Sequence, residues 1–293
     1  LATVENILPH ALKDKKKCPL RIEEATAYSL LAGGKRIRPI LSLAVADMLL
    51  EDASQLPEVQ NYAAAIEMIH CYSLIHDDLP AMDDDAMRRG KPSNHKVYGE
   101  AMAILAGDAL LTKAFSLLNP ADKSSPRIDA KGVLAAGGAL ADYAGKAGMI
   151  GGQVMDIEAE GRTINVAYLE ELQSLKTSCL IQAAVVGSAR LLHAPENVIE
   201  LLDTFALYLG RAFQIQDDIL DVEADPDLLG KTVGKDAKSH KATYVTLLGL
   251  EGAKLKLEEV DAKVMEQLNR LNTLGYEVNF LHTLHSSLSG RRY

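Results

Sequence analysis

The sequence contains no tryptophan, and aromatic residues make up only 5% of its 293 residues. Hydrophobic residues still reach 48%, so the core must be built mainly from leucine, alanine, isoleucine and valine. Charged residues reach 24%, an ordinary fraction for a globular protein. The net charge of -9 argues against nucleic acid as a partner, because nucleic-acid binding depends on a basic surface. It leaves small anionic ligands open.

Cysteine is scarce as well. The three cysteines, Cys18, Cys71 and Cys179, show no CxxC spacing, and their odd number favours reduced, buried thiols over a disulfide framework. The sequence has no run of 18 apolar residues and no apolar signal segment near its start, so we expect no stable membrane insertion. These features together predict a cytoplasmic protein.

Helical periodicity dominates the chain. Apolar residues recur at three- and four-residue spacing over 23–31, 58–76 and 101–118, and alanine-rich segments at 132–148 and 179–192 suit closely packed helices. No sustained alternation indicates a strand. Glycine and proline break the pattern at 32–34, 79–80, 119–126 and 224–227. The sequence therefore predicts one all-α domain over residues 1–293.

An acidic cluster, FQIQDDILDVEAD, occupies residues 213–225. On a continuous helix Asp217 and Asp221 share one face, about one turn apart, and Gln214 joins them. Like charges at this spacing destabilise a helix by a few tenths of a kcal/mol. Because Ile215 and Ile219 lie among them, we do not expect a freely solvated helix, and a functional use of the carboxylates is favoured.

A second stretch, SLIHDDLPAMDDDAMRRGKP at residues 73–92, places five aspartates after an apolar segment and cations directly after them. Asp77 and Asp83 are six residues apart and would diverge on a regular helix. Pro80 removes a backbone donor and disfavours helix at Leu79. We therefore expect a bulge over residues 79–82 that returns Asp83 towards Asp77. The alternative is a solvated, salt-bridged loop.

Carboxylates without histidine or cysteine suit a hard cation such as Mg²⁺, which is completed by waters and substrate phosphates. Zinc would require His or Cys ligands, and a di-iron bundle would require Glu-x-x-His. Like charges about 4 Å apart repel by roughly 4 kcal/mol at an effective dielectric constant near 20. Two acidic clusters facing a diphosphate would therefore need divalent cations between them, and their joint occurrence favours a metal site.

Cations recur in the segment GGKRIRP, residues 33–39, whose glycines allow close backbone approach to an anion. Gly230-Lys231-Thr232 resembles the end of a P-loop, but Asp225 stands where the first glycine is required and no strand precedes it. Lys176-Thr177 lies on a predicted helix. Each of these segments alone is also compatible with a basic surface.

Taken together, LLAGGKRIRP, HCYSLIHDDLPAMDDDAMRRGKP, GGQVMDIE, LKTS, FQIQDDILD and LGKTVGKD resemble the bacterial short-chain trans-isoprenyl diphosphate synthases, most of all their farnesyl-forming members. The resemblance implies an all-α isoprenoid synthase fold, with antiparallel helices around a deep central cavity, usually in a homodimer. It implies head-to-tail condensation of dimethylallyl and then geranyl diphosphate with isopentenyl diphosphate. Magnesium is the implied cofactor, with three ions bound together with substrate.

The resemblance also assigns site residues. The implied metal ligands are Asp77, Asp78, Asp83, Asp217, Asp218 and Asp221. The residues implied to bind the allylic diphosphate are Arg88, Lys176, Lys231 and Lys241, and those implied to bind isopentenyl diphosphate are Lys35, Arg38, His70 and Arg89. Lys176, Thr177 and Gln214 are the implied catalytic residues, which stabilise the allylic cation. In this family the released diphosphate is thought to take the final proton, so His76 is a weak candidate for a base.

Product length is expected to depend on Tyr72 and Ser73, five and four residues before Asp77 and about one helical turn deeper. An aromatic ring there would close the cavity, as in farnesyl-forming relatives, and predicts a fifteen-carbon product. Alternatively Tyr72 is an ordinary core residue.

The alternatives are a geranylgeranyl diphosphate synthase with a deeper cavity, a terpene cyclase, a non-catalytic partner subunit of a prenyl synthase, and a structural helical bundle. The ending HSSLSGRRY departs from the family pattern, which leaves open whether Arg291 or Arg292 helps to close the site.

Overall fold

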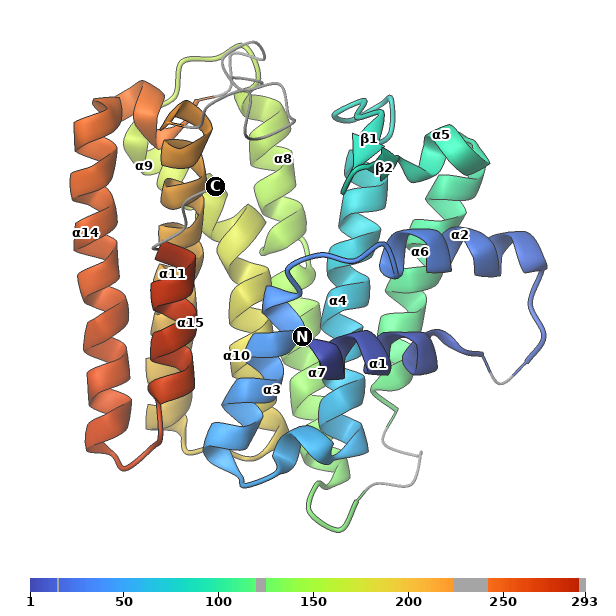
Figure 1. Cartoon of the computed structure of the whole chain (residues 1–293), viewed down its shortest axis with the longest axis horizontal. Coiled ribbons are helices and arrows are strands. Elements are labelled where there is room, and N and C mark those ends of the chain that lie inside the picture. Colours follow the sequence, from blue (N-terminus) through green and yellow to red (C-terminus); the bar gives the residue numbers. More distant parts are fainter. Residues whose placement is uncertain (15, 120–124, 224–241, 290–293) are drawn as a thin grey trace. The chain divides into compact units, whose positions relative to one another are not determined.

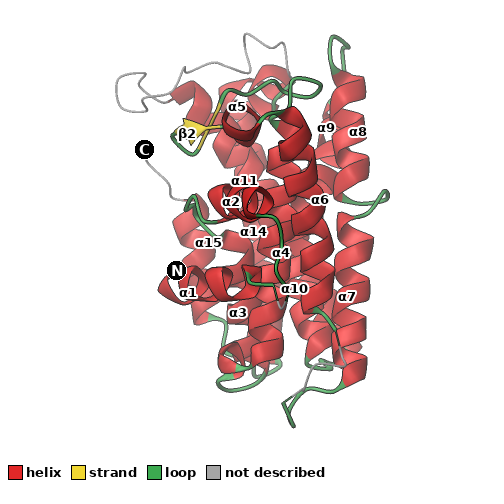
Figure 2. Cartoon of the chain, turned by 90° about the vertical axis from the view of Figure 1, so that its right-hand side faces the viewer, coloured by secondary structure: helices red, strands yellow, loops and turns green. Residues whose placement is uncertain are grey.

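The computed structural model describes residues 1–14, 16–119, 125–223 and 242–289. Almost all of these residues lie in helices or in the turns between them (Figures 1 and 2). The only strands within these ranges are the two-residue β1 (Met87–Arg88) and β2 (Lys91–Pro92). The prediction of an all-α protein is therefore confirmed, apart from this hairpin.

The chain folds into two compact units. The first contains Leu1–Gly138 and Gly187–His193, and the second contains Ala139–Val186 and Ala194–Tyr293. A single domain over residues 1–293 stays a prediction.

The first unit is organised around one long buried helix, α4. It contains α1 (Ala2–Leu12), α2 (Leu20–Leu30), α3 (Ile37–Leu49), the 3₁₀ turn η1 (Ala53–Gln55), α4 (Pro57–Asp77), α5 (Asn94–Tyr98), α6 (Glu100–Leu117) and the start of α7 (Ala130–Ala144). α4 contacts α1, α2, α3 and α6. Its buried residues, which include Val59, Ala63, Met68 and Ile75, lie on all sides of the helix. A helix that is apolar all round is an interior helix, and α4 has that position here.

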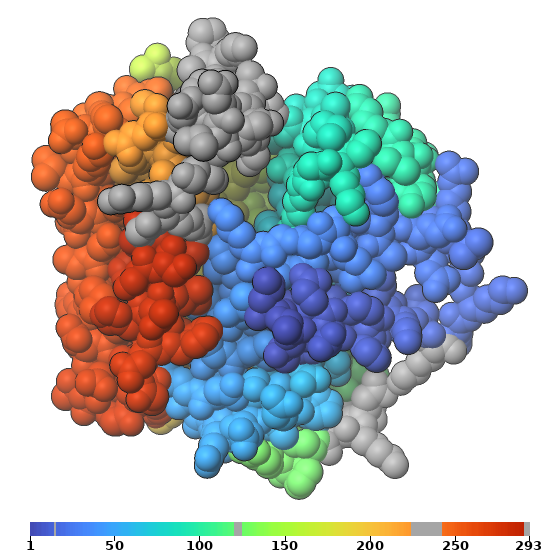
Figure 3. All heavy atoms as spheres, viewed as in Figure 1, coloured from blue at the N-terminus to red at the C-terminus, as the bar shows by residue number. Residues whose placement is uncertain are grey.

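The second unit contains the rest of α7, α8 (Met149–Ala159), α9 (Val166–Gln173), the π-helical turn η2 (Ser174–Ser178), α10 (Cys179–Leu191), α11 (Glu196–Glu223), α14 (Tyr244–Thr273) and α15 (Asn279–Ser289), although the end of α10 belongs to the first unit. α11 and α14 pack along each other. Their shared core includes Ile215, Ile219, Tyr244 and Val260. Figure 3 shows α14 and α15 as one continuous surface, in orange and red.

Most predicted helices agree with the structure to within a few residues. The exceptions have local causes. The alanine-rich segment 132–148 is interrupted, because α7 ends at Ala144 and a turn through Gly145 and Gly148 precedes α8. The predicted breaks at 32–34 and 79–80 are confirmed. The break at 119–126 lies partly, and that at 224–227 wholly, outside the described residues.

All three cysteines are free thiols. Cys71 and Cys179 are buried as predicted, and burial raises their pKa values to about 12 and about 11. The same prediction is wrong for Cys18, which is half-buried in the segment before α2. Among the described helices, none combines the length and the hydropathy that crossing a lipid bilayer requires.

Candidate active site

The first aspartate motif lies where α4 ends and the chain turns back. α4 stops at Asp77, before Pro80. The backbone N–H of Asp83 donates to the C=O of Asp77 at 2.9 Å, and that of Asp84 donates to the C=O of Leu79 at 3.1 Å. The predicted bulge after α4 is therefore confirmed, and it brings the backbone of Asp83 back to Asp77.

Asp78 has a different environment from Asp77, although the two are adjacent in the sequence. It is only 2% exposed, and its Oδ1 accepts hydrogen bonds from Nε of Arg88 at 3.0 Å and from Nη2 of the same residue. Burial raises the pKa of Asp78, and the ion pair with Arg88 opposes this shift. The structure thus gives Asp78 the role of counterion to Arg88, and metal binding by Asp78 stays a prediction.

Arg88 and Arg89 are presented by a hairpin that the sequence analysis missed. β1 and β2 pair antiparallel, with Arg88 opposite Lys91. The connecting residues Arg89 and Gly90 have φ values of +51° and +74°, and a type I′ turn requires positive φ at both central positions. Strands of two residues are too short to show alternation, so the Arg-Gly pair was the only available signal.

The glycine loop before α3 lies against Arg89. Nη1 of Arg89 donates to the C=O of Gly33, and Gly34 has φ +137°. A Cβ atom on Gly34 would lie 2.9 Å from Cζ of Arg89, so any other residue would displace the guanidinium. The glycines therefore allow a close backbone approach, as expected, but in the structure the approaching group is an arginine of the protein itself.

Arg36 is a key residue of this loop that the sequence analysis left unassigned. Its Nη1 donates to Oε1 of Glu67 at 2.7 Å, its Nε donates to Oε1 of Glu5 at 2.8 Å, and its Nη2 donates to the C=O of Leu30 at 2.7 Å. Arg36 and Glu67 are both buried. A loop rich in cations gives no signal of which one turns inward.

Three of the four residues predicted to bind isopentenyl diphosphate come together near Glu67. Nη2 of Arg89 lies 3.8 Å from Oε1 of Glu67. Burial lowers the pKa of Arg38 to about 10, and Glu67 opposes that shift. Burial also lowers the pKa of His70 well below its usual value, and the charges of Arg38 and Arg89 lower it further. His70 is thus a neutral imidazole near pH 7. Lys35, the fourth residue, is exposed on the glycine loop before α3.

The second aspartate motif lies near the C-terminal end of α11. Asp217 and Asp221 are four residues apart on this continuous helix, so they share one face as predicted, and both are half-buried.

Asp218, in contrast, is buried and joins two helices. Its Oδ2 accepts the backbone N–H of Tyr244 at 2.8 Å, and its Oδ1 accepts Nε2 of Gln214 at 3.1 Å. Tyr244 is the first residue of α14, and N–H groups at a helix start have no partner within the helix. Asp218 therefore supplies that partner, and its role as a metal ligand stays a prediction.

Lys176 and Thr177 lie on the π-helical turn η2, where the sequence predicted an ordinary helix. α8 approaches this turn so closely that a Cβ on Gly152 would lie 2.1 Å from the backbone N of Lys176. Nζ of Lys176 donates to Oδ2 of Asp156 on α8 at 2.7 Å. Asp156 belongs to the motif GGQVMDIE, but the sequence analysis assigned it no role.

A pocket of about 160 Å³ opens beside η2 within the second unit, and its lining includes Lys176, Thr177, Gln214 and Asp218. Oγ1 of Thr177 donates to Oε1 of Gln214 at 3.5 Å, the outer limit for such a bond. Gln173 also lines the pocket, and its buried Oε1 has no hydrogen-bond partner. The three predicted catalytic residues therefore share one pocket.

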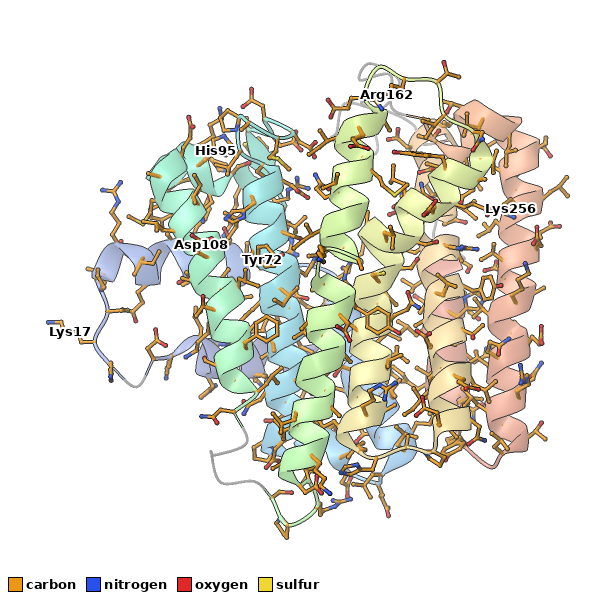
Figure 4. All side chains as sticks on the ribbon, turned by 180° about the vertical axis from the view of Figure 1, so that it is seen from behind. Lys17, Tyr72, His95, Asp108, Arg162 and Lys256 are labelled. Carbon is orange, nitrogen blue, oxygen red and sulfur yellow. The ribbon has the colours of Figure 1, made fainter. Side chains whose placement is uncertain are left out.

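Tyr72 and Ser73 lie on α4, in the last turns before Asp77. Tyr72, labelled on α4 in Figure 4, is 7% exposed. Its ring contacts that of His76 edge to face, with centroids 5.7 Å apart. Burial and the charge of Asp77 raise the pKa of Tyr72. Oγ of Ser73 donates to the C=O of His70 at 3.0 Å.

Some predicted site features stay predictions. Lys231 and Lys241 lie outside the described residues. The two aspartate motifs belong to different units, so the expected meeting of Asp77 with Asp217 is untested. Within the described ranges, no three His, Cys, Asp or Glu side chains converge into a ready-made metal site.

Comparison with known proteins gives consistent matches over most of the chain. The profile of the polyprenyl synthetase family matches residues 19–274. The farnesyl diphosphate synthase of Bacillus subtilis (strain 168) is 44% identical over 99% of this chain and 95% of that protein. The farnesyl diphosphate synthase of Geobacillus stearothermophilus is 51% identical over 82% of this chain and 79% of that protein.

A solved structure shows the same fold. The geranyltransferase of Helicobacter pylori, crystallised with magnesium and isoprenyl diphosphate, superimposes with a TM-score of 0.81 at 36% identity and covers 92% of this chain and 88% of that one. The predicted fold class is confirmed by this match.

Proposed function

The chain belongs to the polyprenyl synthetase family, and from this premise we propose that it is a farnesyl diphosphate synthase. In the proposed reaction the C–O bond of dimethylallyl or geranyl diphosphate breaks, a C–C bond forms to isopentenyl diphosphate, and the released diphosphate takes the proton that is lost. The observation that carries the proposal is the first unit's arrangement. An aspartate motif there leads directly into a hairpin, whose Arg88 pairs with Asp78 and whose Arg89 donates to the C=O of Gly33 in the glycine loop.

Isopentenyl diphosphate is assigned to Lys35, Arg38, His70 and Arg89. Nε of Arg38 is buried and has no hydrogen-bond partner, and an anionic oxygen would supply one. Three arginines, Arg36, Arg38 and Arg89, lie around the buried carboxylate of Glu67. With Glu5 as the second acid they still leave an excess of positive charge, which favours an anion. His70, neutral in the absence of ligand, would gain a proton more readily beside a diphosphate.

The allylic diphosphate is assigned to Arg88 and Lys176, together with Lys231 and Lys241. Arg88 pairs with Asp78 and Lys176 pairs with Asp156, so both cations are held in place by carboxylates. Lys176, Thr177 and Gln214 are the proposed catalytic residues. The oxygens of Thr177 and Gln214 can face the allylic cation as dipoles and shield it from water.

Magnesium is the proposed cofactor, and the donor set fits it. Carboxylate oxygens are its preferred protein ligands, and the bulge after α4 brings the backbone of Asp83 to that of Asp77. Asp217 and Asp221 share one helical face. We propose that these four residues hold three ions together with substrate, with Asp78 and Asp218 supporting them. When bound, the metal supplies positive charge that stabilises the departing diphosphate.

A fifteen-carbon product follows from the proposal that the growing chain extends along α4 until it meets Tyr72. The Tyr72 ring is buried and lies near enough to Asp77 for that charge to raise its pKa. This position supports the proposal that the ring limits the growing chain. We further propose a cytoplasmic homodimer that neither binds nucleic acid nor inserts stably into a membrane.

The test is a product assay. Purified protein is incubated with labelled isopentenyl diphosphate and each allylic primer in turn, with Mg²⁺ or with a chelator, and the products are sized. We expect a fifteen-carbon product from dimethylallyl and geranyl diphosphate, abolished by the chelator. A twenty-carbon main product would instead identify a geranylgeranyl diphosphate synthase. Absence of any condensation with Mg²⁺ would contradict the proposal and favour a non-catalytic subunit.

A further inference from the structure

His76 occupies a notch between two helices of the first unit. It precedes Asp77 on α4, and α4 packs against α6 (Figure 4 labels Tyr72 on α4 and Asp108 on α6). Nε2 of His76 lies 3.1 Å from the C=O of Ile104 on α6. Because a carbonyl oxygen can only accept, Nε2 carries the proton. The imidazole of His76 also contacts the ring of Tyr72, edge to face.

Gly107 forms the floor of this notch. A Cβ atom on Gly107 would lie 2.1 Å from Nε2 of His76, 2.6 Å from Cδ2 and 2.8 Å from Cε1. All three nearest atoms belong to the imidazole, so any side chain at this position would force the ring out of the notch. Glycine is a poor residue for a helix interior, and here the close approach of His76 gives it a physical reason.

The contacts form a chain from α6 to the Tyr72 ring. Gly107 leaves space for the imidazole, the C=O of Ile104 fixes its orientation, and the imidazole presents an edge or face to the phenol. Aromatic rings prefer this T-shaped arrangement, so the position of one ring constrains the other. Without His76 in the notch, the side of Tyr72 that it covers would lose its support.

We propose that His76 and Gly107 are positioning residues that set product length by holding Tyr72 in place. The inference rests on the proposed function. It adds two residues to Tyr72 and Ser73, the pair expected to set product length. His76 takes no proton in this role. Its part is to keep the phenol ring from swinging aside when the growing hydrocarbon chain reaches it.

The experiment compares Gly107→Ala, His76→Ala and the double variant by the ratio of twenty- to fifteen-carbon product. Gly107→Ala evicts the imidazole while improving the helix propensity of α6, so its effect on product length would not come from a weakened helix. Gly138→Ala on α7 is the matched control, because a Cβ there meets no atom within 4 Å. Thermal unfolding confirms that each variant is folded.

We expect each single substitution to raise the ratio several-fold, the double variant to raise it no further than the larger single effect, and Gly138→Ala to leave it unchanged. Non-additivity is expected because both changes break the same contact. An unchanged ratio in both single variants, or fully additive effects, would overturn the inference. So would complete loss of turnover in both folded variants, because His76 would then act in the chemistry. If the wild type forms no fifteen-carbon product, the proposed function itself fails.

Discussion

Individual residues of the same type have distinct environments at this site. Arg36 is buried between Glu5 and Glu67, whereas Arg88 and Arg89 lie on a turn and reach Asp78 and the C=O of Gly33. Each of these guanidinium groups has at least one carboxylate nearby. These three arginines are therefore held in fixed positions by pairing with carboxylates, two of which, Glu67 and Asp78, are buried.

The tight contact between Gly34 and Arg89 leads to a prediction for substrate binding. Gly34→Ala places a Cβ 2.9 Å from Cζ of Arg89 and should displace the guanidinium. Loss of a hydrogen bond to a charged group costs about 1.5–3 kcal/mol, so KM for isopentenyl diphosphate should rise about tenfold or more. KM for the allylic substrate should change little. Steady-state kinetics with each substrate varied in turn measures this.

Gly33→Ala is the control, since a Cβ at Gly33 meets nothing within 4 Å although its φ of +82° is also positive. It should raise KM for isopentenyl diphosphate less than Gly34→Ala does. Equal effects of the two variants would mean that backbone strain, and not displacement of Arg89, is responsible.

The types of residue at the site were predictable from the sequence, but their partners were not. Asp77 and Asp78 are adjacent and chemically identical, yet Asp78 is buried and paired with Arg88, whereas Asp77 is half-buried. The roles of Asp156 and Glu67 were not predicted. Each pairs with a cation far away in the sequence, and a single sequence does not show which cation will reach which acid.

At the level of elements, the beginnings and ends of helices position the functional groups. Asp77 ends α4, Lys176 lies on the turn η2 between α9 and α10, and Asp218 binds the first N–H of α14. A carboxylate at a helix start also interacts favourably with the helix dipole. Asp218 thus serves the fold, while its neighbour Asp217 is left on the face shared with Asp221.

Substitution of the two neighbours should separate these roles. Asp218→Asn replaces one acceptor oxygen by an NH₂ group that faces an existing donor, either Tyr244 N–H or Gln214 Nε2. We expect a loss of about 2 kcal/mol in unfolding free energy and a Tm lower by roughly 5 °C. Asp217→Ala should leave Tm within about 2 °C of the wild type but reduce turnover about a hundredfold or more.

Thermal unfolding and the product assay, applied to both variants, measure these effects. A stable Asp218→Asn protein would show that the bond to α14 contributes little. Near-normal turnover of Asp217→Ala would contradict the metal assignment.

Element boundaries were predictable where a residue enforces them. Pro80 ends α4 and produces the bulge, because its ring geometry acts locally. The π-helical turn at Lys176 was not predictable. It lies where α8 packs on the turn through Gly152, which is 24 residues before Lys176 in the sequence.

For the whole molecule, buried histidines link stability to pH. Burial lowers the pKa of His70, which neighbouring cations lower further, and burial lowers the pKa of His285 against the opposing effect of Asp261. In the unfolded chain both should titrate near their ordinary value of about 6.5. Below that value the unfolded state binds more protons than the native state, so the unfolding free energy decreases as the pH is lowered.

We therefore expect Tm to decrease as pH is lowered from 7.5 to 5, with the loss beginning near pH 6.5. His70→Gln, which cannot titrate, should flatten this dependence. The raised pKa values of Asp78 and Asp261 act in the opposite direction, because these groups bind protons more readily in the native state. A Tm that is constant or rises over this range would show that the carboxylates outweigh the histidines.

The assignment to the all-α class followed from periodicity, because a repeat near 3.6 residues is written into each helix separately. The packing of α11 along α14, through Ile219 and Val260, was not predictable in the same way. Periodicity shows which face of a helix is buried but not which other helix covers it. The meeting of Asp77 with Asp217 is a question of the same kind, and it stays a prediction.

Arg89 shows one consequence of the short hairpin. Its backbone has φ +51°, which is uncommon for a residue with a side chain, and its guanidinium contacts the C=O of Gly33 and the carboxylate of Glu67. A long, flexible side chain normally loses rotational freedom when it grips an anion. Here that entropy is given up during folding, so the arginine is preorganised. Under the proposed function, more of its attraction for a phosphate would then remain available as affinity.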